Sequence, residues 1–268
     1  LVDMVFQGLP NAAVSRILDP ACGAGVFLVL AFRRLYREHW QATGTRPATQ
    51  EIRKILMEQI TGFDISDSAL KFAALSLYLT AIELDPNPTP PEKLKFEDLN
   101  NTVLYNWRRE NEQGTGVVAG SLNPKNETGF DGKFDIVLSN PPWTALEEKS
   151  LASDFNKLSK DIIKRRGQEE FSQQYTNPDK SPDLPFLWKS TEWCKPNGRI
   201  AMALPARILL KQTPVPCKAR EVLFRLIEVN GIVNGSNLAA TGQYALRFFE
   251  RVQAAGDNRH RRALHGQA

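Results

Sequence analysis

The sequence predicts an α/β fold in which helices cover both faces of a mostly parallel sheet. Three observations lead to this prediction. The predicted elements follow one another as helix, strand, helix, strand, helix, strand, long loop and strand. The strands are short, mainly apolar runs, which is typical of strands buried on both faces. Gly-containing turns separate strands from helices, and no internal repeat is visible.

The first strand–loop–helix unit follows a stretch, Leu1 to Leu9, that has the pattern of the middle of a helix. Apolar residues lead into Asp19, a loop with Gly23 and Gly25 follows, and an amphipathic helix is predicted from Val26 to about Tyr36. Glycines in such a loop let the backbone approach a ligand closely. Ligands of this kind of sheet bind outside the carboxyl ends of the strands, where Asp19 is expected to stand.

The second unit has the same organisation. Gln59–Asp64 is predicted as a strand, Ser66 as an N-cap, and residues 67–84 as a long helix with one apolar face. An acid at the end of the second strand can accept hydrogen bonds from both ribose hydroxyls of a nucleoside. For Asp64 taken alone, a surface acid at a strand end is the simpler interpretation.

The stretch Asn140–Trp143 is the most informative part of the chain. It follows Phe134–Ser139, which is predicted as a buried parallel strand. The Asn140 amide oxygen can accept a hydrogen bond, and neither proline has a backbone N–H, so the strand end offers mainly acceptors. Trp143 adds a flat aromatic face. Together these groups suit a planar ring with an exocyclic amine, such as adenine. The alternative is a strand that ends in Pro-Pro, with Trp143 in the core.

Two segments interrupt the alternation of strands and helices. Residues 106–133 are rich in Gly, Asn and Glu and are predicted as a surface loop. Residues 147–183 begin as a charged helix and end in Gln-, Asn- and Pro-rich sequence. This second segment could fold over a bound target or could be a surface insertion, and the sequence favours neither. Its basic residues are interleaved with acids, which favours a solvated helix face over a phosphate-binding surface.

The last predicted elements are a helix over residues 184–194, a turn at 196–198 and a strand over 199–204. Trp188 and Trp193 lie on the helix and are expected in the core.

Composition indicates a soluble globular protein with one large domain. The net charge of +4 and the pI near 8.9 permit a polyanionic partner without requiring one. Three widely spaced cysteines indicate neither a disulfide framework nor a metal cluster, so no metal is expected, and Cys22 is interpreted as a packing residue. No apolar run could span a bilayer and no signal peptide is visible, so we expect no membrane partner and a cytoplasmic location.

The loop after Asp19 distinguishes between cofactors. A dinucleotide fingerprint needs a third glycine three residues after Gly25, and Leu28 stands there instead. An acid beside the loop opposes a phosphate and suits a cation. S-adenosylmethionine carries a sulfonium and an ammonium group and no phosphate, and it is the expected cofactor.

In its motifs the chain resembles the catalytic core of adenine-specific DNA methyltransferases of the gamma type, the kind found in restriction–modification systems. The run Asp19-Pro20-Ala21-Cys22-Gly23-Ala24-Gly25 is similar to the family's cofactor motif, and Asn140-Pro141-Pro142-Trp143 to its catalytic motif, in the family's order. Gly62–Ser66 is similar to the second acidic motif and, less closely, Phe96–Leu99 to the third. The similarity extends over about residues 1–238.

The resemblance implies a Rossmann-like, S-adenosylmethionine-dependent methyltransferase fold. It implies catalytic roles for Asn140, Pro141, Pro142 and Trp143. It also implies contacts with the cofactor, made by Asp19, Pro20, Ala21, Cys22, Gly23, Gly25, Asp64, Ile65, Asp98 and Leu99. The implied reaction transfers a methyl group to the exocyclic amino group of adenine in double-stranded DNA, with the adenine flipped out of the helix.

We expect a methyltransferase catalytic domain over residues 1–240, incomplete at its N-terminus, and a divergent or disordered tail over residues 241–268. The family motif that touches the methionine end of the cofactor would precede Leu1, and a target-recognition domain has no room. We therefore expect a chain truncated at both ends, which would need a separate specificity domain or subunit. Its activity as it stands, its recognition sequence, its oligomeric state and its nuclease partner are left open.

Two other functions remain open. Methyltransferases that act on protein glutamine or RNA guanine also use Asn-Pro-Pro-aromatic, but their cofactor loops usually read Gly-x-Gly-x-Gly, so Pro20-Ala21-Cys22 favours DNA. The second alternative is a truncated module that binds cofactor or DNA without turnover.

Overall fold

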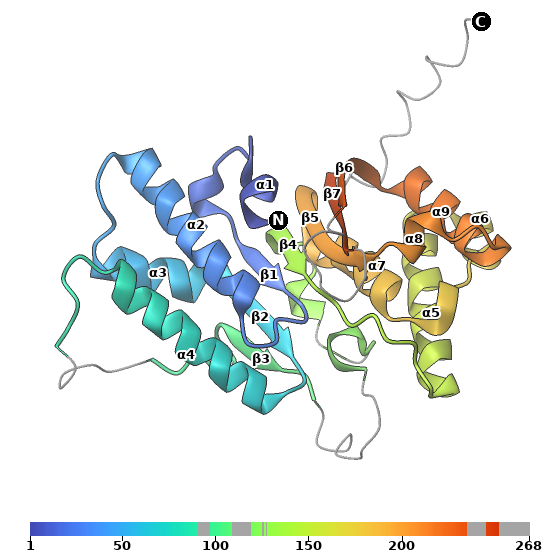
Figure 1. The fold of residues 1–268 in the computed structure, drawn as a ribbon, viewed down its shortest axis with the longest axis horizontal. Helices are drawn as coiled ribbons and strands as arrows, with labels where there is room; N and C mark the ends of the chain where they lie inside the picture. Colours follow the sequence, from blue (N-terminus) through green and yellow to red (C-terminus); the bar gives the residue numbers. More distant parts are fainter. Residues whose placement is uncertain (91–96, 109–118, 125, 127, 235–244, 252–268) are drawn as a thin grey trace, which may run out of the picture.

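The computed structural model describes residues 1–90, 97–108, 119–124, 126, 128–234 and 245–251. Their strands form one sheet in the order β3-β2-β1-β4-β5-β7-β6 (Figure 1). Strands from β3 to β5 pair in parallel, and β7 pairs antiparallel with both β5 and β6. The strands are β1 Ile17–Asp19, β2 Ile60–Asp64, β3 Leu104–Asn106, β4 Phe134–Ser139, β5 Cys194–Pro205, β6 Glu228–Asn234 and β7 Ala245–Arg251.

Helices cover both faces of this sheet (Figure 1). One layer contains α1 Val2–Phe6, α2 Val26–Thr43, α3 Thr49–Gln59 and α4 Asp67–Leu84. The other contains α5 Lys149–Arg165, α7 Asp183–Trp193, α8 Arg207–Leu210 and α9 Pro214–Leu226, with α6 Glu169–Gln174 beside α5. Single 3₁₀ turns lie at η1 Ala12–Val14, η4 Gly120–Leu122, η5 Thr128–Phe130 and η6 Pro178–Lys180. The expected α/β architecture is confirmed.

Successive residues of the central strands enter opposite hydrophobic clusters. Ile17 of β1 packs with α1–α4, whereas its neighbour Leu18 packs with α5, α7 and α9. In β4, Ile136 and Leu138 face the first layer and Val137 faces the second. Because both faces of these strands are buried, their sequences are mainly apolar rather than strictly alternating.

The bounds of several predicted elements agree with the structure to within one residue. The strand Phe134–Ser139 and the helix Asp67–Leu84 have the predicted bounds, and α7 begins and ends one residue before its prediction. Trp188 and Trp193 are buried in the core, as expected. The helix α2 is longer than predicted, since it continues to Thr43 and ends at Gly44, which takes a left-handed conformation.

Two predictions need correction. The boundary at residue 240 divides the sheet, because Ala245–Arg251 forms β7 between β5 and β6. The remaining positions of the proposed tail, 241–244 and 252–268, lie outside the described residues. The turn at 196–198 does not separate a helix from a strand. It is an irregularity within β5, where Asn197 has a positive φ of 64° and the register with β4 shifts.

Of the helices that the structure describes, none has the length and apolarity needed to cross a membrane.

Candidate active site

Three neighbouring strands end beside one another at the carboxyl edge of the sheet. β1 ends at Asp19, β2 at Asp64 and β4 at Ser139, with β1 in the middle. The Ser139 hydroxyl donates a 3.1 Å hydrogen bond to Oδ1 of Asp19. The Gly23 N–H donates a 2.8 Å hydrogen bond to Oδ2 of Asp64. The glycine loop (Pro20–Gly25) therefore lies next to the residues that follow β4, as the sequence predicted.

The glycine loop is fixed by its own backbone. The Cys22 N–H donates to the Phe63 carbonyl of β2 at 2.9 Å, and the Gly25 N–H donates to the Cys22 carbonyl at 2.8 Å. Gly25 has a φ of +84° and stands at the N-cap of α2. A Cβ at this position would lie 3.0 Å from the Cβ of Ala73, so α4 packs directly on the loop. Only glycine meets both requirements without strain.

Asp19 is a buried acid whose pKa is raised. Its side chain accepts hydrogen bonds from the Ala21 N–H, at 3.2 Å, and from Ser139. Burial raises the pKa of Asp19 from its ordinary 3.8 to about 7, and the nearby charge of Asp64 adds to the rise. The two hydrogen bonds act in the opposite direction. The carboxyl is thus partly protonated at neutral pH, and a bound cation would favour its ionised form.

Asp64 holds two parts of the chain together. Its Oδ2 accepts the Gly23 N–H, and its Oδ1 accepts the Ser66 N–H at 2.8 Å. Each carboxylate oxygen has capacity for a further hydrogen bond, so ribose hydroxyls could be accepted as well. Ser66 is the N-cap of α4, as predicted, because its hydroxyl accepts the Ala69 N–H at 3.3 Å. Ile65 is half-buried between these two residues.

The residues expected to be catalytic, Asn140–Trp143 (the catalytic tip), leave β4 with Asn140 accessible. Asn140 and Pro142 are exposed, whereas Pro141 is buried and Trp143 is half-buried. Within the described part of the chain, the Asn140 side chain makes no hydrogen bond. The Trp143 indole N–H donates to the Ala203 carbonyl of β5 at 3.2 Å, which fixes the orientation of the ring. The tip is therefore open at Asn140 and anchored at Trp143.

Cys22 has the environment of a packing residue. It is buried and free, and burial raises the pKa of its thiol, with the negative charges of Asp19 and Asp64 adding to this effect. A thiol whose pKa is raised is a poor nucleophile at neutral pH. Among the described residues, no group of three or more His, Cys, Asp or Glu side chains could hold a metal ion.

Asp98 and Leu99, predicted as cofactor-binding residues, are not brought to this edge. Both precede β3, so they lie at the amino end of that strand, whereas the ligand edge is the carboxyl end. Leu99 is buried in the cluster that α1–α4 form, and the Asp98 carboxylate accepts the N–H of Asn100. We therefore correct the expectation, drawn from the resemblance of Phe96–Leu99 to the third motif, that Asp98 and Leu99 contact the cofactor.

The residues at the carboxyl end of β3 are Asn106 and Trp107. The Trp107 N–H donates to the Asp64 carbonyl at 2.9 Å, and its ring lies 4.8 Å from that of Phe63. Neither residue was predicted from the sequence to lie at the ligand edge. The short apolar run Leu104–Tyr105, followed by a polar residue, resembles the other strand ends and could have indicated a strand here. Ser139 was missed too, because a buried serine at a strand end has no distinctive pattern.

The segment after the tip is built into the domain. Leu151, Phe155 and Ile162 of α5 are buried, and Tyr175 belongs to the same hydrophobic cluster. The Ser181 hydroxyl donates to the Trp143 carbonyl at 3.2 Å. This finding goes against the alternative of a loose surface insertion, because the segment contacts the catalytic tip directly.

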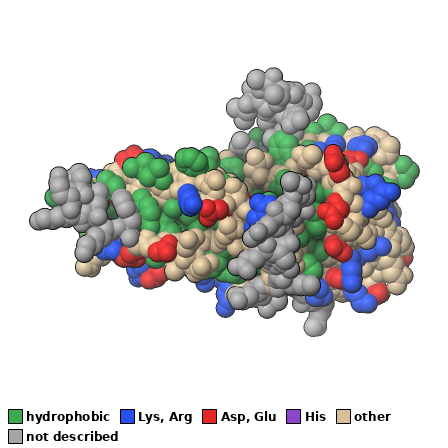
Figure 2. All heavy atoms as spheres, turned by 90° about the horizontal axis from the view of Figure 1, so that it is seen from below, with side chains coloured by type: hydrophobic (Ala, Val, Ile, Leu, Met, Phe, Trp, Pro, Cys, Tyr) green, Lys and Arg blue, Asp and Glu red, His purple; other side chains and the backbone are tan. Residues whose placement is uncertain are grey.

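Two basic residues of this segment are paired with acids, and Lys160 and Arg166 donate to backbone carbonyls. Lys164 lies 3.0 Å from Glu169 and Arg165 lies 2.6 Å from Glu192. Figure 2 shows one face of the molecule, on which basic and acidic side chains are mixed over the described surface. The predicted solvated helix face of mixed charge is confirmed for these residues.

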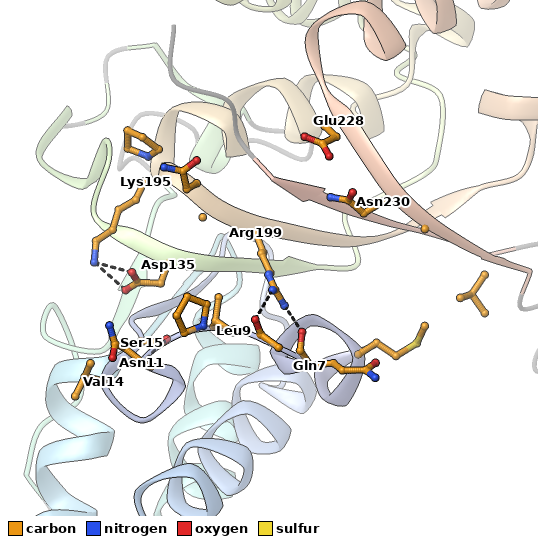
Figure 3. A pocket seen from close by; sticks show the side chains of 18 of the residues that line it. Gln7, Leu9, Asn11, Val14, Ser15, Asp135, Lys195, Arg199, Glu228 and Asn230 are labelled. Atoms are coloured by element: carbon orange, nitrogen blue, oxygen red, sulfur yellow. Dashed lines mark hydrogen bonds and ion pairs between the residues drawn. The ribbon is translucent and has the colours of Figure 1, made fainter. Parts of the chain in front are cut away.

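A hollow of about 920 Å³ opens at the opposite edge of the sheet, near the amino ends of β4 and β5 (Figure 3). Its cationic groups are engaged by the chain itself. Lys195 pairs with Asp135 at 2.8 Å, and the Arg199 guanidinium donates to three backbone carbonyls at and after the end of α1. Since it lies at the amino edge, the hollow is separate from the candidate active site.

Comparisons with known proteins agree with this geometry. The chain is 24% identical over 161 residues to the adenine-specific methyltransferase PglX of Streptomyces coelicolor. The matched region covers 53% of this chain and 13% of the relative. The type I restriction-modification methyltransferase subunit from Streptococcus thermophilus has a similar structure, with a TM-score of 0.56 and 16% identity over 94% of this chain and 44% of that one. The type ISP restriction-modification enzyme LlaBIII, solved bound to DNA, gives a TM-score of 0.59 at 14% identity, over 94% of this chain and 18% of that one.

The strand order and the similarity to these solved structures define a Rossmann-like fold, and the match to a methylase family model makes it a methyltransferase domain. The chain spans only about an eighth of the curated relative and less than half of the two solved chains. A family model matches residues 58–235, and the chain belongs to the family it describes, the Eco57I restriction-modification methylases.

Proposed function

We propose that this chain is the catalytic core that transfers a methyl group from S-adenosylmethionine to the exocyclic amino group of adenine in DNA, within a restriction–modification or related system. One observation carries the proposal. The exposed side chain of Asn140 stands at the end of β4, and the residue before it is hydrogen-bonded to Asp19 at the start of the glycine loop. Family membership and the adenine-specific relative support the same reaction.

The residues of the glycine loop fit the proposed cofactor. A Cβ at Gly23 would meet no atom within 4 Å, so open space adjoins the loop backbone. Asp19 supplies an acid for a cationic ligand, and Asp64 retains acceptor capacity for ribose hydroxyls. Cofactor contacts are proposed for Asp19, for Pro20–Cys22 with Gly23 and Gly25, and for Asp64 and Ile65. When bound, S-adenosylmethionine supplies an electrophilic methyl group on its sulfonium.

The proposed roles of Asn140 and Pro141 concern the attacking amine. The lone pair of an exocyclic adenine nitrogen is delocalised into the ring, which makes the amine a poor nucleophile. Oδ1 of Asn140 and the carbonyl of Pro141 can each accept one of its two N–H groups. These hydrogen bonds would localise the lone pair and orient it, which is catalysis by positioning and electrostatics. Because the amine becomes cationic on methylation, its proton can leave afterwards without a strong base.

Pro142 and Trp143 would shape the pocket for the base. An adenine amine cannot be reached inside a duplex, so the base must leave the stack, at a cost of about a few kcal/mol. The Trp143 ring, held by its hydrogen bond to Ala203, offers a preoriented stacking surface that offsets part of this cost. Double-stranded DNA with a flipped adenine is thus the proposed substrate, and a separate specificity domain or subunit the proposed partner.

The two other functions differ in substrate or in turnover. An enzyme acting on protein glutamine or RNA guanine would use the same two acceptors, but family membership favours DNA. A non-catalytic module would not need an exposed Asn140 beside an intact glycine loop. We therefore treat both as outcomes of the test.

The test offers DNA, RNA and a glutamine-containing protein substrate to the chain with S-adenosylmethionine labelled in its methyl group. We expect label on adenine of DNA alone. Asn140→Ala should lower the rate at least about 10³-fold and change cofactor affinity by less than about threefold, measured by calorimetry. Asn87→Ala, an exposed asparagine beyond the end of α4, is the matched control. Label on RNA or protein instead of DNA would contradict the substrate, and an equal fall in cofactor affinity would contradict the role of Asn140.

A further inference from the structure

One arginine contacts the backbone of the catalytic tip. Nη2 of Arg207 donates to the carbonyl of Trp143 at 3.1 Å. The same nitrogen lies 2.8 Å from the Ser181 hydroxyl and 2.5 Å from Oδ2 of Asp183. Its Nε lies 3.3 Å from Asp179. The guanidinium therefore joins the tip to the segment that leads into α7.

The position of Arg207 in the fold is set by β5. Arg207 opens α8, directly after the carboxyl end of that strand, and Ala203 near the same end accepts the indole N–H of Trp143. Trp143 is thus bound twice from this side, once through its ring and once through its carbonyl. The anchor on the other side of Arg207 is rigid, because the Asp183 side chain is only 3% exposed.

The two ends of the tip are consequently fixed by different residues. Before Asn140, the Ser139 hydroxyl is bonded to Asp19. After Pro142, the Trp143 carbonyl is bonded to Arg207 and Ser181. The two prolines between these anchors restrict the backbone further.

We propose that Arg207 is a positioning residue, which holds the end of the tip so that the Asn140 side chain and the Pro141 carbonyl keep a fixed separation. This inference rests on the proposed function for its effect on rate. A displacement of about 1 Å in such acceptors can lower a rate about 100-fold. A planar guanidinium suits the role because its donors are fixed in direction, whereas an ammonium is a flexible point charge.

The competing explanation is that Arg207 only neutralises the carboxylates of Asp179 and Asp183. The chain offers a matched control for it. Lys211 also pairs with Asp179 but has no contact with Trp143 among the described residues, and its side chain is 40% exposed. Charge balance at Asp179 predicts similar effects for both cations, whereas a role in positioning predicts an effect for Arg207 alone. Charge balance at the buried Asp183 is tested by Arg207→Lys, which keeps the positive charge but not the planar donors.

The experiment compares Arg207→Ala, Arg207→Lys and Lys211→Ala with the wild type. The first readout does not depend on activity. Chymotrypsin cleaves after aromatic residues, and the bond after Trp143 contains the carbonyl that Arg207 holds. We expect cleavage at this bond, located by mass spectrometry, to become about tenfold faster or more in Arg207→Ala and to stay unchanged in Lys211→Ala.

The second readout is single-turnover methylation of DNA at saturating S-adenosylmethionine. We expect about a 100-fold lower rate for Arg207→Ala, an intermediate rate for Arg207→Lys, and cofactor affinity within about threefold of wild type in both. If Arg207→Ala does not fold, Ser181→Ala carries the test, because it removes the other donor to the Trp143 carbonyl and should show the same changes more weakly.

Equal effects of Arg207→Ala and Lys211→Ala would overturn the inference, as would unchanged cleavage after Trp143. A parallel loss of cofactor affinity and rate would overturn it too, because it would indicate general damage. If the wild type transfers no methyl group to any substrate, the proposed function fails, while the cleavage readout still decides whether Arg207 holds the tip.

Discussion

The hydroxyl of Ser139 donates a hydrogen bond to the buried carboxylate of Asp19 across 120 residues of sequence. The first of these residues ends β4 and the second ends β1, two strands that pair in parallel. This hydrogen bond joins the residue just before the catalytic tip to the residue just before the glycine loop. The relative placement of the two proposed substrates is thus a property of adjacent strand ends, and not of flexible loops.

The first prediction concerns stability and pH. Because the pKa of Asp19 is raised from 3.8 to about 7, the folded chain binds more protons than the unfolded chain between these values. The free energy of unfolding should therefore fall as the pH rises from about 4 to about 7. Asp19→Asn keeps an acceptor for Ala21 and Ser139 and removes the buried charge. We expect it to stabilise the chain at pH 8 by on the order of 1–4 kcal/mol, measured by urea unfolding.

Asp154→Asn, on the exposed face of α5, is the matched control for the loss of one negative charge. A variant of Asp19 that is less stable than the wild type at pH 8 would show that the buried charge is not a cost in the folded state.

The second prediction concerns cofactor binding and pH. If ionised Asp19 faces a cationic ligand, protonation of this carboxyl competes with binding. Affinity for S-adenosylmethionine should then fall below pH 7 by up to about tenfold per pH unit. Calorimetry at pH 6 and pH 8 measures this change, and Asp19→Asn should bind weakly at both. Equal wild-type affinities at the two pH values would remove Asp19 from the proposed cofactor site.

The third prediction separates two glycines of the same loop. Gly25→Ala places a methyl group 3.0 Å from the Cβ of Ala73 at a positive φ, so we expect a loss of roughly 2–4 kcal/mol in unfolding free energy. Gly23 also has a positive φ, but a methyl group there would meet open space. For Gly23→Ala we therefore expect a loss of only roughly 1 kcal/mol in unfolding free energy. In Gly23→Ala the methyl group enters the space proposed for the cofactor, and affinity should fall although the fold is retained.

Thermal unfolding and calorimetry on the two variants check this pair. A Gly23→Ala protein that binds S-adenosylmethionine as tightly as the wild type would place the cofactor elsewhere.

The fourth prediction concerns cysteine reactivity. Cys22 is buried with a raised thiol pKa, and Cys217 is half-exposed at the start of α9. Brief treatment with iodoacetamide at pH 8 should alkylate Cys217 well before Cys22, as peptide mass spectrometry would show. Faster labelling of Cys22 would mean that the glycine loop opens readily in solution.

Much of this architecture could be predicted because the decisive patterns are local. Phe134–Ser139 is an apolar run long enough to specify a buried strand, and its end places Asn140 at the ligand edge. The glycine loop is specified by the residues it contains. In contrast, β3 is as short as β1 but is not followed by a motif such as the glycine loop, so its three residues alone do not locate a strand. The expected cofactor contact of Asp98 consequently rested on the resemblance alone, without a strand to place it.

Arg207 could not be found from sequence for a different reason. Its partners Trp143 and Asp183 are 64 and 24 residues away, and nothing in the residues around it differs from an ordinary helix start. The contact exists only because β5 ends beside β4. Residues that act through tertiary contacts of this kind have no local signature.

The antiparallel strand β7 has a consequence for how the chain is made. It is the last described element, yet it pairs with β5 on one side and β6 on the other. Until residues 245–251 leave the ribosome, a nascent chain presents two unsatisfied strand edges, of the kind that invites aggregation. Assembly of this half of the sheet must therefore wait until residues 245–251 have been synthesised, and a premature stop shortly before residue 245 should yield insoluble protein even though every residue of the glycine loop and catalytic tip is present.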